Sequence, residues 1–169
     1  MKKVVLTGPE STGKTTLCIQ MGEEYDCPVV EEYARSYIRE LDRPYDLNDL
    51  KRIAEGQIKL EERIHSASHM ISDTDLLTIK IWSEYKYDAC DQWILDNLNE
   101  RLPDLYLLCY PDLIWESDPL RENPEDLMEL YEIYLKEIKR LNVPYRIIKG
   151  SGSIRLENCK NALREINFK

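Results

Sequence analysis

A glycine-rich segment near the amino terminus carries the residue types of a phosphate-binding loop. Residues 8–15 read GPESTGKT, which matches the P-loop pattern G-x-x-x-x-G-K-[ST] at every fixed position. Gly8 and Gly13 allow backbone conformations that point several N–H groups at an anion. Lys14 is expected to reach the β- and γ-phosphates of ATP, and the Thr15 hydroxyl is expected to bind Mg²⁺.

The surroundings of this loop also fit a phosphate site. A short apolar strand is predicted immediately before it, at 3–7, and a helix begins near Lys14, so the positive end of the helix dipole faces the phosphates. A chance match in a chain of this length has a probability on the order of 1%, because glycine makes up about 7% of residues. We therefore expect ATP and Mg²⁺ as cofactors. The loop and helix residues expected to hold the nucleotide are Gly8, Glu10, Ser11, Thr12, Gly13, Lys14, Thr15 and Thr16.

A second candidate site follows the predicted strand at 70–72. Asp73 comes at the end of this strand, and ligands bind outside the carboxyl ends of strands in open α/β sheets. A carboxylate there can hold Mg²⁺, so Asp73 is a candidate catalytic residue and metal ligand. Asp75, two residues later, is a candidate contact for the acceptor hydroxyl. The alternative is that the segment is a helix N-cap, where aspartate is common.

Two glutamates end another predicted strand, at 29–31, and belong to the same edge of the sheet. Glu31 and Glu32 point in opposite directions if both are extended. We favour Glu32 as the residue that binds the acceptor hydroxyl or acts as a base. Arg35 lies one turn later, where it can orient Glu32 or contact phosphate. The alternative is a solvated surface pair, because charged residues are mostly exposed.

The segment 111–124 is predicted to be a long irregular loop after the strand at 105–109. It is polar, contains three prolines and shows no periodicity. Long loops in compact domains are usually functional, so we expect a lid that closes over the site and excludes water. Arg121 is the candidate catalytic arginine for the transferring phosphoryl group, with a surface ion pair as the alternative. Trp115 is the candidate for stacking on a flat or cationic ring.

A short segment with two glycines, 150–153, follows the last predicted strand. It suits a loop near the adenine of the nucleotide. Arg155, just after it, is a candidate cofactor-binding residue that stacks there. A surface position at the start of a helix is an equally good interpretation of Arg155.

Strands and helices alternate along the chain, which predicts an α/β fold with a parallel sheet covered on both faces. Short apolar runs predict five strands, at 3–7, 29–31, 70–72, 105–109 and 145–148. Helical periodicity predicts helices at 15–24, from 33 to before Pro44, from about 48, around 76–82, and at 91–102, 127–141 and 154–166. We expect a P-loop NTPase fold in a single domain over 1–169, with the lid at about 111–124.

Composition restricts the partners. The formal net charge is −9, so the chain has no general attraction for nucleic acid or anionic lipid. No apolar run reaches the roughly 18 residues of a membrane span, and no secretory signal is recognised at the start. The five cysteines form no C-x-x-C pair, which fits reduced thiols and a cytoplasmic location. We expect a small-molecule partner and make no prediction of oligomeric state.

Six segments, taken in order, resemble the ribosylnicotinamide kinase domain of the NadR family. They are GPESTGKT at 8–15, EEYAR at 31–35, DLKRIAEGQ at 49–57, SDTDLLTIKIW at 72–82, LYLLCYPDLIWESDPLR at 105–121 and GSIR at 152–155. The resemblance implies a nucleoside-monophosphate-kinase-like fold and ATP-dependent phosphorylation of nicotinamide riboside to nicotinamide mononucleotide, a step of NAD biosynthesis. It also implies that Lys14 and Thr15 hold ATP and Mg²⁺ and that Asp73 opens the DTD motif. Arg121 would then be the lid arginine, and Trp115 is the best match for a ring that stacks on nicotinamide.

The sequence departs from the family pattern in the lid. Ile114 stands where the family usually has proline, and Pro119 stands where it tends to have glycine, so the lid and substrate choice are expected to differ. No H-x-G-H signature of an adenylyltransferase occurs, so we expect kinase activity alone. Two alternatives remain: a kinase for another nucleoside or nucleotide, and a nucleotide-dependent switch or partner-binding ATPase. The N-K-x-D signature of a GTPase switch does not occur.

Overall fold

The fold is built on a parallel sheet, as the alternation of strands and helices predicts. The computed structural model describes residues 1–118 and 122–168. The sheet has five strands in the order β2-β3-β1-β4-β5, and each neighbouring pair is parallel. The strands are β1 Lys2–Thr7, β2 Val29–Val30, β3 His69–Asp73, β4 Leu105–Cys109 and β5 Tyr145–Ile148.

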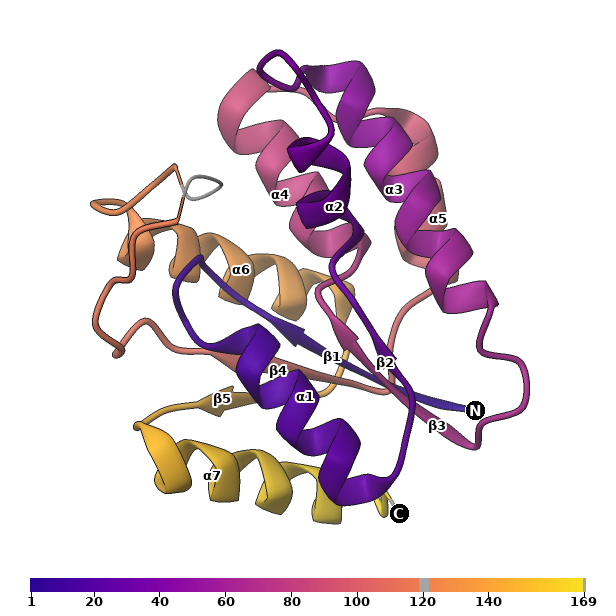
Figure 1. Cartoon of the computed structure of the whole chain (residues 1–169), viewed down its shortest axis with the longest axis vertical. Helices are drawn as coiled ribbons and strands as arrows, with labels where there is room; N and C mark the ends of the chain where they lie inside the picture. Colours follow the sequence, from indigo (N-terminus) through magenta and orange to yellow (C-terminus); the bar gives the residue numbers. More distant parts are fainter. Residues whose placement is uncertain (119–121, 169) are drawn as a thin grey trace.

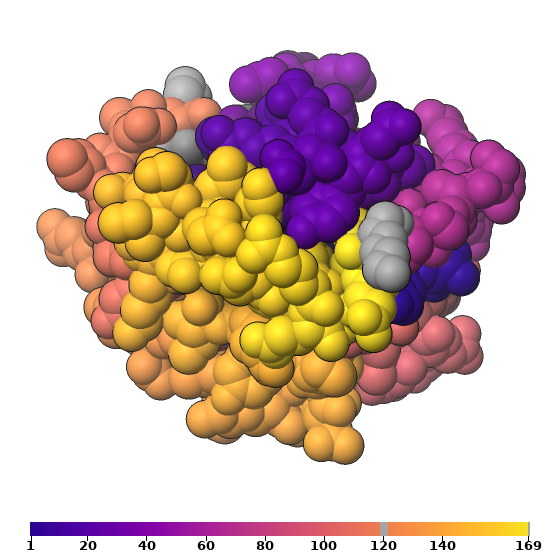
Figure 2. Space-filling model, turned by 90° about the horizontal axis from the view of Figure 1, so that it is seen from below, coloured from indigo at the N-terminus to yellow at the C-terminus, as the bar shows by residue number. Residues whose placement is uncertain are grey.

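Helices cover both faces of this sheet. Figure 1 shows α1 and α7 on one face and the remaining helices on the other, and Figure 2 shows α1 and α7 side by side on the first face. The helices are α1 Lys14–Tyr25, α2 Tyr33–Arg39, α3 Leu47–Glu62, α4 Leu76–Tyr87, α5 Gln92–Glu100, α6 Leu127–Leu141 and α7 Gly152–Glu165. Among the helices that the structure describes, none is long and apolar enough to cross a membrane.

The central strand shows why the sheet is buried on both sides. Side chains alternate between the two faces of a strand. In β1, Val4 and Leu6 pack in the cluster beneath α1 and α7, whereas Val5 packs in the cluster beneath the other helices. All three side chains are fully buried. A strand covered on both faces is apolar along its length, which is why this short run was recognisable in the sequence.

One helix is shorter than its periodicity predicted. The helix expected to continue almost to Pro44 ends at Arg39. The chain is then fixed by the start of α3, where Asp46 and Asp49 form a reciprocal capping box. Asp49 is fully buried and also accepts hydrogen bonds from Arg43. These contacts hold the α2–α3 connection in a non-helical conformation.

Candidate functional site

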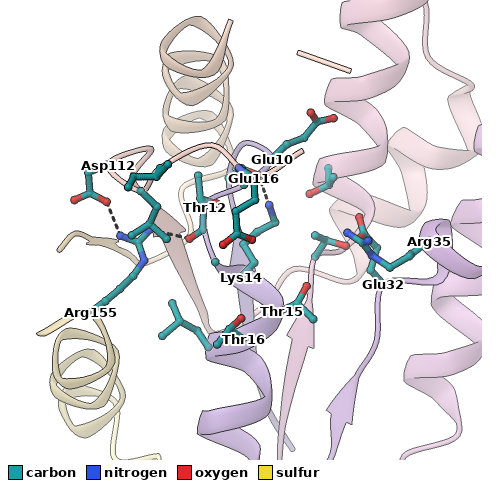
Figure 3. A pocket seen from close by; sticks show the side chains of 18 of the residues that line it. Glu10, Thr12, Lys14, Thr15, Thr16, Glu32, Arg35, Asp112, Glu116 and Arg155 are labelled. Atoms are coloured by element: carbon teal, nitrogen blue, oxygen red, sulfur yellow. Dashed lines mark hydrogen bonds and ion pairs between the residues drawn. The ribbon is translucent and has the colours of Figure 1, made fainter. Parts of the chain in front are cut away.

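The carboxyl ends of the parallel strands surround a cavity of about 550 Å³, a size typical of small-ligand sites. The phosphate loop and the first turn of α1 form its floor. Residues of α2 and α4 line one part of the cavity, and the start of the lid and the start of α7 line another. Figure 3 shows the two parts on opposite sides of Lys14, with Glu32 and Arg35 on one side and Asp112 and Arg155 on the other.

The phosphate loop is folded as its glycines predict. Gly8 has φ 129° and Gly13 has φ 75°, conformations that favour glycine. A Cβ on Gly8 would also lie 2.8 Å from the carbonyl oxygen of Cys109. The Lys14 ammonium donates to the carbonyl oxygens of Gly8 and Pro9, at 2.9 and 2.7 Å. The loop is therefore preformed, with its lysine held inside it.

Thr15 and Asp73 meet beside this loop. The Thr15 hydroxyl donates to Oδ2 of Asp73 at 2.6 Å. The Asp73 side chain is buried, and its Oδ1 has no hydrogen-bond partner among the described residues. Burial raises the pKa of Asp73, while the hydrogen bond from Thr15 and the charge of Lys14 act in the opposite direction.

These two oxygen groups fit a magnesium ion. The residues that the structure describes contain no group of three or more His, Cys, Asp or Glu side chains that would hold a metal alone. Mg²⁺ at nucleotide sites needs only one or two protein ligands, because phosphates and water complete its shell. The buried, unpaired oxygen of Asp73 next to the Thr15 hydroxyl has the chemistry of such a site.

The acceptor side of the cavity is formed by α2. Glu32 is the N-cap residue of α2 and is largely buried, with 14% of its side chain exposed. Burial raises its pKa, and the negative charge of Asp73 raises it further, while Lys14 and Arg35 lower it. Arg35 Nε lies 3.6 Å from Oε2 of Glu32, and Arg35 Nη1 donates to Asp118 of the lid at 2.9 Å. Glu32 and Arg35 both line the cavity, as expected for a substrate site.

Arg155 has a different environment from the two that its sequence position suggested. It lines the cavity but is buried, with 2% of the residue exposed, so the surface interpretation is wrong. Its guanidinium donates to Asp112 at 2.6 Å and to the carbonyl oxygens of Thr12, Tyr110 and Gly150 at 2.9 Å. Arg155 therefore ties the phosphate loop to the ends of β4 and β5, and this placement does not support stacking on the adenine.

Asp75 is part of the core. It is the N-cap of α4 and accepts a hydrogen bond from the Leu77 amide at 3.0 Å. Its other oxygen accepts from the Tyr106 hydroxyl at 2.7 Å, and only 2% of the residue is exposed. Asp75 does not belong to the described residues that line the cavity. The expected contact with the acceptor is therefore not supported, whereas the helix-cap alternative is.

The lid segment contributes Asp112, Leu113, Ile114 and Glu116 to the cavity lining. Trp115 is not one of the described residues that line the cavity. Arg121, expected to contact the transferring phosphoryl group, lies outside the described residues, as does Pro119.

Trp82 is a cavity residue that was not among the site residues expected from the sequence. It lies on α4 one turn after Thr78, which also lines the cavity. Ala34 and Ile38 of α2 line the same part. Residues four apart share a helix face, so the spacing of Thr78 and Trp82 after the DTD motif was an available signal.

The fold and this site define a P-loop protein with a nucleoside-monophosphate-kinase-like fold. A family model described as "AAA domain" matches residues 3–155, and the chain belongs to this family.

Several solved structures share the fold. A NadR protein in complex with NR superposes with a TM-score of 0.78 at 22% identity, covering 97% of this chain and 51% of that one. A NadR protein with NAD and AMP-PNP gives 0.75 at 21%, covering 97% and 49%. Deoxyadenosine kinase from M. mycoides gives 0.70 at 15%, covering 96% and 99%. The chain thus spans about half the length of the NadR chains that it matches, and the resemblance seen in the motifs is confirmed at the level of the fold.

Proposed function

We propose that this chain is an ATP-dependent kinase that phosphorylates a nucleoside, and that nicotinamide riboside is its acceptor. The observation that carries the proposal is the composition of one cavity. The phosphate loop and Thr15 form its floor, with Asp73 hydrogen-bonded to Thr15 beside them, and a largely buried carboxylate and an aromatic ring lie on its acceptor side. In this proposal residues 1–169 work as one kinase domain, with 111–124 as its lid.

On the donor side the chain binds the polyphosphate and spreads its charge. Backbone N–H groups of the loop and the N-terminus of α1 hold the phosphates. Lys14 moves from the loop carbonyls to the β- and γ-phosphates, where it stabilises the charge that develops during transfer. Thr15 and Asp73 would hold Mg²⁺, which neutralises phosphate charge when bound.

On the acceptor side Glu32 is placed to accept the proton of the attacking hydroxyl. Its raised pKa favours proton uptake, because a base is most effective when its pKa approaches the working pH. Arg35 lies beside it and holds its orientation through the 3.6 Å contact. The Arg35–Asp118 contact joins this pair to the lid, so closure of the lid and positioning of Glu32 are linked.

The acceptor-side wall suits a flat, cationic ring. Trp82 supplies an aromatic face, and Ala34 and Ile38 supply apolar surface. Glu32 adds negative charge close by. A pyridinium ring gains from a nearby aromatic face and from carboxylates in a cavity partly shielded from solvent. The same features accept an uncharged base less favourably, which supports nicotinamide riboside over ordinary nucleosides.

A direct assay tests this assignment. Phosphate transfer from ATP is measured for nicotinamide riboside, adenosine, deoxyadenosine, uridine and thymidine monophosphate at equal concentrations. We expect the highest kcat/KM for nicotinamide riboside. Turnover of another acceptor without nicotinamide riboside would reject the acceptor but keep the kinase. ATP hydrolysis that no acceptor accelerates would reject the kinase in favour of a nucleotide-dependent switch.

Replacement of Trp82 tests how the acceptor ring is recognised. Trp82→Ala is expected to raise KM for nicotinamide riboside about 2- to 30-fold, because a cation–π contact contributes about 0.5–2 kcal/mol. KM for ATP and for uncharged nucleosides should change less. Trp82→Phe keeps an aromatic face and is the matched control, with an intermediate KM expected.

Trp115→Ala, measured in the same series, tests the expectation from the sequence. If Trp115 carries the contact with the ring, it alone will show the selective rise in KM. An equal loss for every acceptor in Trp82→Ala would show that Trp82 contributes only to the packing of α4.

A further inference from the structure

A carboxylate in a phosphate loop needs a compensating partner, and Glu10 has one in the lid. Glu10 is the third residue of the loop. Its Oε2 accepts hydrogen bonds from the backbone N–H groups of Glu122 and Asn123, at 2.9 and 3.2 Å. In Figure 3 its carboxylate is turned away from Lys14. Hydrogen bonds from N–H groups to an ionised carboxylate are stronger than neutral ones, so this contact is a substantial one.

The next residue of the loop makes a similar contact on the other side of the lid. The Ser11 hydroxyl oxygen accepts from the backbone N–H of Glu116 at 2.9 Å. Ser11 has φ 56°, a left-handed conformation. Two consecutive loop side chains therefore contact the outgoing and the returning parts of the lid.

The side chain of Glu122 extends this contact to the acceptor side. Its carboxylate accepts from Lys86 at the end of α4, at 3.0 and 3.1 Å, and from the Tyr45 hydroxyl at 3.0 Å. Lys86 also lies 3.8 Å from the centre of the Tyr45 ring. The Tyr87 hydroxyl donates to the backbone carbonyl of Tyr45 at 2.7 Å. Glu122 thus joins the returning part of the lid to α4 and to the α2–α3 connection.

The two parts of this network differ in strength. The Glu122–Lys86 pair is exposed to solvent by 34% on the lysine and 44% on the glutamate, and exposed ion pairs contribute little. Glu10 is partly buried and bonds to two backbone groups. On the returning part of the lid, the stronger of these contacts is therefore the one that Glu10 makes with the backbone, and the side chain of Glu122 adds a weaker, exposed contact with the acceptor side.

We propose that Glu10 is a positioning residue that holds the returning end of the lid against the phosphate loop, so that the binding of polyphosphate and the closure of the lid favour each other. The reason is electrostatic. With the lid away, the Glu10 carboxylate would lack its two N–H donors and would repel the phosphates bound beside it. With the lid in place, the N–H groups compensate this charge. The kinetic consequence rests on the proposed kinase function, whereas the contact itself does not.

Hydrogen exchange tests the contact without any substrate. Amide exchange of the lid is followed by mass spectrometry in wild type, Glu10→Gln and Glu10→Ala. We expect exchange at Glu122 and Asn123 to rise about 10-fold or more in Glu10→Ala, because local opening then loses its main restraint. Exchange in Glu10→Gln should lie between that of wild type and that of Glu10→Ala, since the carboxamide oxygen still accepts one hydrogen bond. Glu125→Ala, which removes an exposed carboxylate just after the lid, is the control and should exchange like wild type.

The proposed coupling between polyphosphate binding and closure of the lid predicts a combination of effects that a general loss of structure would not produce. In Glu10→Gln, the affinity for AMP-PNP should stay equal or increase about 2- to 5-fold, because repulsion of the phosphates is removed. The kcat of the same variant should fall, because the lid closes less often. A fall in AMP-PNP affinity together with kcat would contradict the proposed repulsion between Glu10 and the phosphates, and unchanged exchange at 122–123 in Glu10→Ala would overturn the contact. If wild type phosphorylates no acceptor, the exchange and affinity measurements still decide this proposal while the proposed function fails separately.

Discussion

Replacing Lys14 by alanine is expected to lower kcat by at least about 10²-fold, since one charged group directed at the transferring phosphoryl stabilises the transition state by about 2.7 kcal/mol or more. The protein should remain folded. The Lys14 ammonium donates only to the carbonyl oxygens of Gly8 and Pro9 among the described residues, and both lie within the same loop. The loss should appear mainly in kcat, because the lysine contributes more to the transition state than to ground-state binding.

The control for this variant removes a lysine elsewhere. Lys136→Ala makes the same change of side chain on α6, at an exposed position, and should keep full activity. Circular dichroism and thermal unfolding of both variants establish that the fold is retained. Turnover near that of wild type in a folded Lys14→Ala would contradict the assignment of the phosphate loop.

The phosphate loop and the sheet were predictable because their physical requirements are local. Gly8 and Gly13 adopt backbone conformations that few other residues tolerate, and β1 is apolar because both its faces are covered. Such requirements leave a pattern in consecutive residues. The five strands were recognisable as short apolar runs, and the assignment of Asp73 to the site followed from the rule that ligands lie at the carboxyl ends of parallel strands.

Other features depend on contacts between distant segments, and the sequence does not encode these in a short pattern. Asp75 was a candidate for the acceptor site because it lies near Asp73 in the sequence. In the structure its carboxylate instead accepts a hydrogen bond from the hydroxyl of Tyr106 in β4. Arg155 is buried, and its guanidinium is paired with Asp112, which lies 43 residues away in the sequence. Trp82 lines the cavity, with Ala34 and Ile38 of α2, only because of the way α4 is placed on the sheet. Each outcome required the three-dimensional arrangement of helices around the sheet.

Replacing Asp73 by asparagine is expected to lower kcat about 10²-fold or more at limiting Mg²⁺ and to shift the Mg²⁺ dependence to higher concentration. Asparagine keeps the shape of the side chain but loses the charge that attracts the metal. Activity should be measured over a range of Mg²⁺ concentrations at saturating ATP. Partial recovery at high Mg²⁺ is the result expected of a weakened metal ligand. An unchanged Mg²⁺ dependence would remove Asp73 from the metal site.

Stability separates this role from that of a structural carboxylate. Burial raises the pKa of Asp73 in the folded protein, so the folded state binds a proton more readily than the unfolded chain does. The ionised group therefore lowers the free energy of unfolding at neutral pH, and wild type gains stability as pH falls through the raised pKa. Asp73→Asn should unfold at an equal or higher temperature than wild type at neutral pH, and this pH-dependent gain should be smaller.

Asp75→Ala is the matched comparison within the same DTD motif. It removes the N-cap of α4, which costs about 0.5–2 kcal/mol, and it leaves the buried Tyr106 hydroxyl without its acceptor, which costs about 1–3 kcal/mol. We expect a clearly lower unfolding temperature with no shift in the Mg²⁺ dependence. The reverse assignment, with Asp75 in the site and Asp73 in the core, would exchange the two results. Thermal unfolding and Mg²⁺ titration of the two variants therefore distinguish the ligand from the helix cap.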